Sequence, residues 1–278
     1  MKRFALVVLV VSLAISPLLA GVEDRTTDSK TFPAARLVIV DNINGNIEAS
    51  GYNGNDLVME VTRTVHAESA ERLATANREV KLNAEQSSDT VKLFVDAPDR
   101  CNCENSRGRS QHEGYTVRYD FKLRVPAAAR VDLYTVNAGK ILVNGIAGDF
   151  DIKNVNGEIE MNGVAGSGHA HTVNGPVKVV FLRNPTSSSS FETVNGNVDL
   201  AFLNGLSADV RMQTLNGAMY TDFEVTAAPE PSQPPENRGG KFVYHRGGAT
   251  RVRIGAGGIA VTTKTLNGNI YIRNQENK

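Results

Sequence analysis

Three groups of residues in this sequence carry side chains that could do chemistry. In the first, His169 and His171 alternate in the stretch GHAH, so on a strand they would point to the same side. Asp151 occupies the position equivalent to His169 in an alignment of the repeats described below. Two imidazoles and a carboxylate are acceptable Zn²⁺ ligands, but Lys153 stands beside His171 in that alignment and would repel a cation. These three residues are a weak metal candidate, and we predict surface histidines with no bound metal or other cofactor.

The second group is the only two cysteines, Cys101 and Cys103, in the polar stretch DRCNCENSRGRSQHEG. In an exported protein two such thiols would oxidise. A Cys-x-Cys bridge closes a very small, strained ring, so a labile redox pair or a metal site with His112 are alternatives. We favour a disulfide between Cys101 and Cys103 that staples a loop.

The third group is a recurring Asn-Gly pair, most often within Thr-aliphatic-Asn-Gly. Its copies are Asn44-Gly45, Asn156-Gly157, Asn174-Gly175, Asn195-Gly196, Asn216-Gly217 and Asn267-Gly268. Gly adopts positive φ freely and Asn tolerates it, so the pair suits a tight turn, and between two strands it also indicates a hairpin. Catalysis would not need six copies. We therefore predict structural corners that stack on one another, with amide hydrogen bonds from copy to copy, and keep separate hairpins as the alternative.

The spacing of these Asn residues defines the elements that carry them. With Asn137 included, positions 137, 156, 174, 195, 216 and 267 are separated by 19, 18, 21, 21 and 51 residues. A period near 20 is typical of a solenoid, whose coils bury their faces against their neighbours. In FETVNGNVDLAF we interpret Val194, Val198 and Leu200 as core, because the equivalent positions are mostly apolar throughout. The first coil has one extra residue, which predicts a bulge at 138–140.

The fold class predicted is all-β: a single-chain, β-helix-like solenoid of about 20-residue coils with one short helix near the N-terminus. Residues 1–20 are typical of a signal peptide, with Lys2 and Arg3 before a short apolar run. A flexible lead-in at 21–35 precedes an N-terminal β section at 36–130, which contains a helix at 67–80 and the cysteine loop at 99–114. The repetitive section covers 131–273 and includes a Pro-rich excursion at 227–240.

Charge and composition exclude several classes of partner. Acidic and basic residues number 30 each, so nothing indicates nucleic acid, and no second segment is apolar enough to span a bilayer. The columns of side chains expected to face outward are mixed in charge, for example Asp151, His169, Ser190, Arg211 and Thr262. Because no carboxylate pair recurs on adjacent coils, we predict that the protein is not an enzyme.

Three segments resemble a known family. They are DNINGNIEASGYNGNDLVMEV, VRYDFKLRVPAAARVDLYTVNAGKILVNG and GAGGIAVTTKTLNGNIYI, and the resemblance over 37–273 is to the bacterial putative-adhesin family of exported domains of unknown function. It implies a β-solenoid at the bacterial cell surface or in the periplasm, and it implies no ligand and no catalytic residues. The chain departs from the family pattern at Asn137-Ala138 and at the Pro-rich excursion.

The expected function is that of a non-enzymatic exported β-solenoid, either an adhesin or a binding or structural protein of the cell envelope. Its partner would be an envelope component, a glycan or another protein, and self-association is a further option. The alternatives are a carbohydrate-active β-helix enzyme and a periplasmic assembly or sensing component. For a glycan, Tyr220 and Tyr271 are the aromatic pair in equivalent outward positions.

Overall fold

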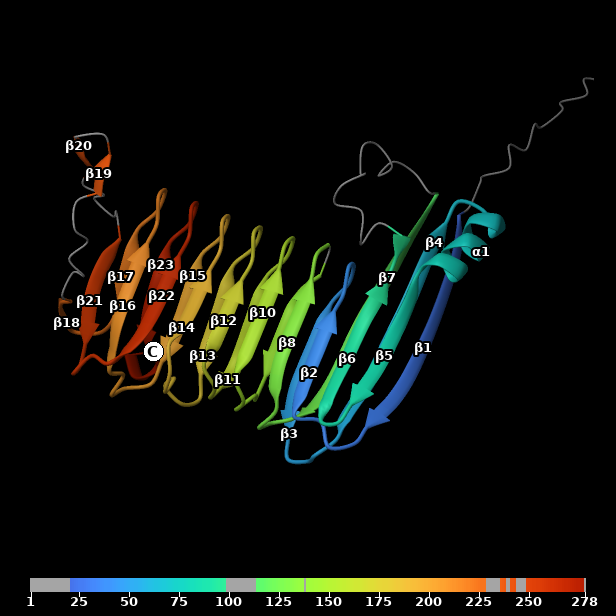
Figure 1. Ribbon diagram of the computed structural model, residues 1–278, viewed down its shortest axis with the longest axis horizontal. Helices are drawn as coiled ribbons and strands as arrows, with labels where there is room; N and C mark the ends of the chain where they lie inside the picture. The colour runs from blue at the N-terminus through green and yellow to red at the C-terminus, as the bar shows by residue number, and fades with distance from the viewer. Residues whose placement is uncertain are drawn as a thin grey trace, which may run out of the picture.

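The computed structural model describes residues 21–98, 114–137, 139–228, 236–238, 241–243 and 249–277. Within them the chain is nearly all β-structure, in two large sheets with one short α-helix, α1 (Ala70–Glu79), and a closing 3-10 turn, η2 (Gln275–Asn277). Figure 1 shows the two sheets as two layers, one behind the other, that both run along the length of the molecule, with α1 at the end that holds β1.

The first sheet has ten strands, most of them paired in parallel. In spatial order these are β1 (Val22–Phe32), β4 (Leu57–Ala67), β7 (Tyr115–Pro126), β3 (Ile47–Tyr52), β9 (Ile141–Asn144), β11 (Ile159–Val164), β13 (Val177–Phe181), β15 (Val198–Phe202), β23 (Ile270–Asn274) and β17 (Met219–Thr221). Antiparallel pairing is confined to β1, β4 and β7 at one end.

The second sheet has eleven strands and also ends in antiparallel pairs. In spatial order these are β18 (Val225–Ala227), β21 (Thr250–Ile254), β16 (Ala208–Gln213), β22 (Ile259–Lys264), β14 (Ser189–Glu192), β12 (Gly168–His171), β10 (Phe150–Asn154), β8 (Arg130–Thr135), β2 (Leu37–Asp41), β6 (Thr90–Asp96) and β5 (Lys81–Ser87). A separate pair joins β19 (Glu236–Arg238) to β20 (Lys241–Val243).

The repeating unit is one strand from each sheet joined by an Asn-Gly corner. The strand before Asn156-Gly157, β10, lies in the second sheet, and the strand after it, β11, lies in the first. The two strands beside a corner therefore do not pair with each other, and the hairpin alternative is wrong. Both sheets are open, with edge strands at each end, so the structure shows two large sheets rather than closed coils.

The space between the sheets is filled by alternate residues of the strands away from the sheet edges. Ile159, Val177 and Val198 lie in register on adjacent strands and are fully buried. Aromatic rings pack among them, with the Phe181 and Phe202 ring centroids 4.7 Å apart in a stacked pair. Each such ring or aliphatic side chain contributes about 2 kcal/mol by leaving water, which makes this core the main source of stability.

The corner motif is explained by hydrogen bonds between successive corners. The Thr hydroxyl at its first position donates to the Gly carbonyl of the neighbouring corner, as from Thr193 to Gly175 at 2.8 Å. The Asn amides form a ladder, in which the Nδ2 group of Asn195 donates to Oδ1 of Asn174 at 2.8 Å. The same hydrogen bond between side-chain amides joins Asn156 to Asn137, Asn174 to Asn156, Asn267 to Asn195 and Asn216 to Asn267. Asn44 differs, because its amide donates to the carbonyl of Val117.

The aliphatic residue before each corner Asn is not core, which corrects the interpretation of Val194. The preceding Thr, such as Thr193 at 4% exposure, points between the sheets, so the next side chain points away from them at the turn. Val194 is half-buried, while Leu266 and Leu215 are 42% and 72% exposed. We call this column the aliphatic ridge; its members are Ile43, Val136, Val155, Val173, Val194, Leu266 and Leu215.

The last strand pair of the repeats, β22 with β23, which we call the C-terminal coil, does not lie at the end of the stack of strand pairs. β22 pairs with both β14 and β16, and β23 pairs with both β15 and β17. The last coil in sequence is thus inserted between two earlier coils. Arg273 Nε on β23 consequently reaches Asp199 Oδ1 on β15 at 2.7 Å.

The N-terminal section belongs to the same two sheets as the repeats, because β2 pairs with β8 and β3 pairs with β9. The flexible lead-in predicted at 21–35 is wrong: Val22–Phe32 forms β1, paired with β4 along its whole length. As an edge strand it is exposed on most positions, so it lacks the apolar alternation that marks a half-buried strand.

The helix lies within the range predicted from the sequence, at Ala70–Glu79. Ser69 caps it by accepting a hydrogen bond from the backbone N–H of Arg72, and Ala76 is its fully buried contact with the sheet. Several other predictions fall outside the described residues: the signal peptide, Cys101 and Cys103 with most of their loop, Ala138 of the predicted bulge, and most of the Pro-rich excursion. The register supports one extra residue in the first coil, since Ile141 pairs with Ile159 although it follows its Asn by one position more.

Candidate functional site

An open cleft of about 1790 Å³ lies where the first sheet extends past the corner line. At Asn44-Gly45 the chain turns from one sheet to the other, and Tyr119 of β7 is level with this corner, because its N–H donates to the carbonyl of Asn44 at 2.9 Å. β7 nevertheless continues beyond the corner to Tyr115, paired with β4 as far as Ala67. The strands of the second sheet turn away at this level, so the extensions of β4 and β7 form one wall of the cleft.

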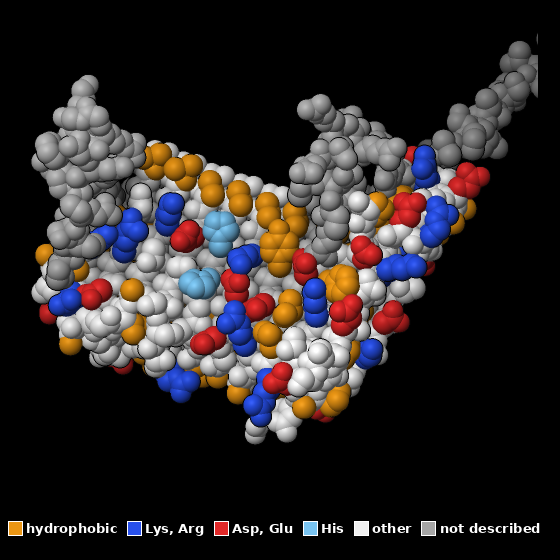
Figure 2. Space-filling view, in the orientation of Figure 1, with side chains coloured by type: hydrophobic (Ala, Val, Ile, Leu, Met, Phe, Trp, Pro, Cys, Tyr) orange, Lys and Arg blue, Asp and Glu red, His pale blue; other side chains and the backbone are white. Residues whose placement is uncertain are grey.

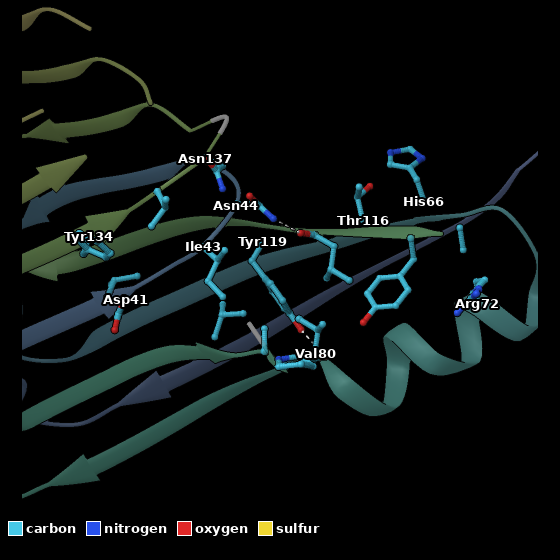
Figure 3. A pocket seen from close by; sticks show the side chains of 18 of the residues that line it. Asp41, Ile43, Asn44, His66, Arg72, Val80, Thr116, Tyr119, Tyr134 and Asn137 are labelled. Carbon is cyan, nitrogen blue, oxygen red and sulfur yellow. Dashed lines mark hydrogen bonds between the residues drawn. The ribbon is translucent and has the colours of Figure 1, made fainter. Parts of the chain in front are cut away.

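The opposite wall is built from the ends of second-sheet strands. Val40, Val95 and Leu133 contribute nearly buried side chains at its base. Figure 3 shows Ile43 and Tyr119 in the middle, between Asp41 and Tyr134 on one side and His66 and Arg72 on the other. The partly exposed apolar surface comes from Ile43, Ala97, Tyr115, Tyr134 and Val136.

The polar groups of the cleft include charges of both signs toward its ends and the buried hydroxyl of Tyr119 in its middle. Nδ1 of His66 lies 3.5 Å from a carboxylate oxygen of Glu23. Across the cleft, Lys153 Nζ donates to Asp151 at 2.7 Å. Burial raises the pKa of the Tyr119 hydroxyl, which stays neutral and accepts a hydrogen bond from Arg63 Nε at 3.1 Å. An apolar interior beneath a rim of both signs suits a ligand with an apolar body and polar groups.

The aliphatic ridge continues the apolar surface out of the cleft. Ile43 and Val136 line the cleft and are also the first two members of the ridge. Figure 2 shows hydrophobic side chains in a row along the upper edge of the molecule, above the face that carries the histidines. Adjacent strands are about 4.8 Å apart, so the column from Ile43 to Leu215 is about 29 Å long. Cleft and ridge together form one continuous surface, which we call the apolar strip.

The structure places the predicted metal candidates on neighbouring strands but does not assemble a ligand set. Asp151 pairs in register with His169, and Lys153 with His171. Asp151 accepts a hydrogen bond from Lys153. Nδ1 of His169 lies 2.7 Å from the Ser190 hydroxyl oxygen, within hydrogen-bonding distance. Within the described residues no three His, Cys, Asp or Glu side chains are grouped to hold a metal ion.

Outward carboxylates elsewhere on the sheets form ion pairs with cations on the same or adjacent strands. Lys140 contacts both Glu158 and Glu160, and these contacts raise the pKa of Lys140 and lower that of Glu160. Arg253 donates to Asp209 at 2.7 Å. These pairs are at the surface, where water and salt screen them, so they contribute little to the stability of the fold.

The cleft was not predicted from the sequence. The available signal was the length of the segment at 115–126, which is much longer than the strands of the repeats and therefore must project beyond them. The ridge corresponds to a regular recurrence of aliphatic residues along the chain, but aliphatic character alone predicts core. Tyr220 and Tyr271 do lie side by side facing outward, as the repeat alignment indicates.

Sequence and structure comparisons give distant likenesses only. No protein-family model matches the sequence, and no curated protein is similar to it at a significant level. Solved structures that are similar include a putative cell adhesion protein from Clostridium sporogenes, with 11% identity, 91% of this chain and 100% of that chain covered, and a TM-score of 0.44. A putative adhesin from Bacteroides fragilis has 7% identity, coverage of 90% and 97%, and a TM-score of 0.37. A putative lipid binding protein from Parabacteroides distasonis has 10% identity, coverage of 90% and 96%, and a TM-score of 0.34.

Identities and TM-scores this low assign neither a family nor a function to the chain. Among the described residues, the structure contains no helix with the length and hydropathy needed to cross a membrane.

Proposed function

We propose that this protein is an exported, non-enzymatic binding protein of the cell envelope, built as a two-sided β-solenoid, which holds an amphiphilic envelope component on its apolar strip. The observation that carries the proposal is the continuity of cleft and ridge through Ile43 and Val136. The strip is partly exposed aliphatic surface, with Leu266 and Leu215 the most exposed of its members, and continuous apolar patches of this kind mark interaction sites.

The rigidity of the scaffold supports a binding role. The ridge is fixed to the two sheets by backbone bonds from each corner Asn to the previous ridge residue, such as Asn174 N–H to Val155 at 2.8 Å. A preorganised surface loses little conformational freedom when its ligand binds, which favours affinity. The leader-like residues 1–20 and the resemblance to the adhesin family agree with an exported setting.

The proposal is tested by retention on isolated cell-envelope fractions. The protein is expressed as the full chain, so that the host removes any leader, and is purified and mixed with envelopes that are then sedimented. We expect the wild type to sediment with them and Val136→Asp to lower its apparent affinity about tenfold, because a carboxylate would be buried against apolar ligand groups.

Leu182→Asp is the matched control, because Leu182 is 68% exposed and does not belong to the apolar strip. This variant is expected to sediment like the wild type. Thermal melting of all three proteins separates loss of binding from loss of fold. A folded wild type that ignores the envelopes, or an equal loss in both variants, would contradict the proposal.

A further inference from the structure

Two tyrosine rings are stacked on the outer face of the first sheet, at the end remote from the cleft. Tyr271 of β23 and Tyr220 of β17 pair in register, and their ring centroids are 5.1 Å apart at an interplanar angle of 8°. In a stacked pair of rings, a ring keeps free aromatic surface only on a face that no neighbouring side chain covers. β17 is the edge strand of the sheet, so one face of Tyr220 looks past the edge, and this side chain is 52% exposed.

Arg273 completes the arrangement by covering the other ring. Its guanidinium carbon lies 4.7 Å from the Tyr271 ring centroid, and its Nε donates to Asp199 Oδ1 at 2.7 Å. That hydrogen bond is the main reason why the pKa of Arg273 is raised, with burial opposing it. Asn269 Nδ2 donates to the Tyr271 hydroxyl at 3.0 Å, so both the ring and the guanidinium are held before any ligand arrives.

A small hollow of about 220 Å³ lies between these groups and the carboxylate of Asp222. It is lined by Tyr220, Asp222, Tyr271, Ile272 and Arg273. Asp222 Oδ2 accepts a hydrogen bond from the backbone N–H of Asn274 at 3.1 Å, which fixes the carboxylate at the edge of the sheet. The hollow therefore adjoins an aromatic ring with one open face and a fixed carboxylate acceptor, while Arg273 holds the Tyr271 ring that backs Tyr220.

We infer that this hollow and the open face of Tyr220 beside it form a binding subsite for a neutral saccharide, whose apolar C–H face stacks on Tyr220 while one of its hydroxyl groups donates to Asp222. A pyranose ring combines one apolar face with a rim of hydroxyls, and each hydroxyl both donates and accepts. The fixed carboxylate can accept a hydrogen bond from such a hydroxyl. An apolar chain would offer Asp222 no donor, and an anion would be repelled by it.

The site depends on the insertion of the C-terminal coil. Asp199 lies on β15, and only because β23 is adjacent to β15 can Arg273 reach it. The subsite is independent of the apolar strip, since it lies on a different face and shares no residue with it.

Saturation-transfer NMR tests the inference with cellobiose, chitobiose, lactose and mannobiose as probes. The wild type is expected to transfer saturation to at least one of them, most strongly to the protons of one ring face. Tyr220→Ala should weaken the apparent affinity about fivefold, which corresponds to losing one aromatic stacking contact, whereas Tyr220→Phe should stay within about twofold. Leu182→Ala, at an exposed residue outside both the hollow and the apolar strip, is the control and should not change binding.

Asp222→Asn is expected to reduce transfer as well, because the amide keeps an acceptor oxygen but loses the charge. Thermal melting is measured for each variant, and all of these positions are at the surface. The absence of transfer to every probe, or equal transfer by the wild type and Tyr220→Ala, would overturn the inference. Loss of envelope retention in Val136→Asp with saccharide binding intact would show the two sites to be separate.

Discussion

Gly196→Ala is expected to lower the free energy of unfolding by about 3 kcal/mol, through overpacking at the centre of the corner column. A Cβ at this position would lie 2.1 Å from the carbonyl oxygen of Gly175 and 2.5 Å from its carbonyl carbon. Both atoms are backbone, so the corner itself must move. The shift would strain the Thr193 to Gly175 bond of 2.8 Å and the Thr265 to Gly196 bond of 2.9 Å at once.

Urea unfolding followed by circular dichroism measures this effect, and Gly205→Ala is its control. Gly205 has φ near 77° but nothing within 4 Å of a Cβ, so only its left-handed backbone is penalised, by about 1 kcal/mol. If the two substitutions cost the same, the corners are not stacked as closely as described.

A disulfide between positions 192 and 264 is expected to form almost completely in Glu192→Cys/Lys264→Cys, whereas Glu192→Cys/Gln213→Cys should stay reduced. Both pairs are made in a chain with Cys101→Ser and Cys103→Ser. Glu192 is in register with Lys264 on the adjacent strand, and Lys264 is in register with Gln213 on the next. Adjacent strands are about 5 Å apart and next neighbours about 10 Å, while a disulfide needs Cα atoms about 4.4 to 6.8 Å apart.

Intact mass and free-thiol titration after air oxidation report the outcome. Lys264→Cys/Gln213→Cys serves as a second positive pair, since these residues are also adjacent. Bridging of 192 to 213, with none from 192 to 264, would place the C-terminal coil at the end of the stack and would remove the basis of the Arg273 contact with Asp199.

The sequence predicts the parts of this fold that depend on local periodicity. The alternation around Val198 and Leu200 specifies a strand with one buried face. The recurring Asn-Gly corners, aligned with one another, specify which residues of successive strands lie side by side. The spatial order of the strand pairs does not follow from this local pattern. The C-terminal coil carries the same pattern as the other strand pairs and fits in more than one place. Only long-range pairing of β22 with β14 and β16 decides the insertion.

The surfaces were harder to predict than the core. Apolar character indicates burial, but at a turn the direction of a side chain changes within one residue, so Val194 and Leu215 face outward although they are aliphatic. The cleft depends on β4 and β7 extending past the corner line, and strand length relative to neighbouring strands is a property of the assembled sheets. Edge strands such as β1 are held by backbone bonds and leave little trace in side-chain pattern.

The proposed binding role is tested most directly by fluorescence titration of the purified protein with N-phenyl-1-naphthylamine, an uncharged amphiphile. The account predicts saturable binding at one site per chain, about tenfold weaker in Val136→Asp and unchanged in Leu182→Asp. Binding that does not saturate, or that Val136→Asp leaves as strong as in the wild type, would contradict a ligand site on the apolar strip.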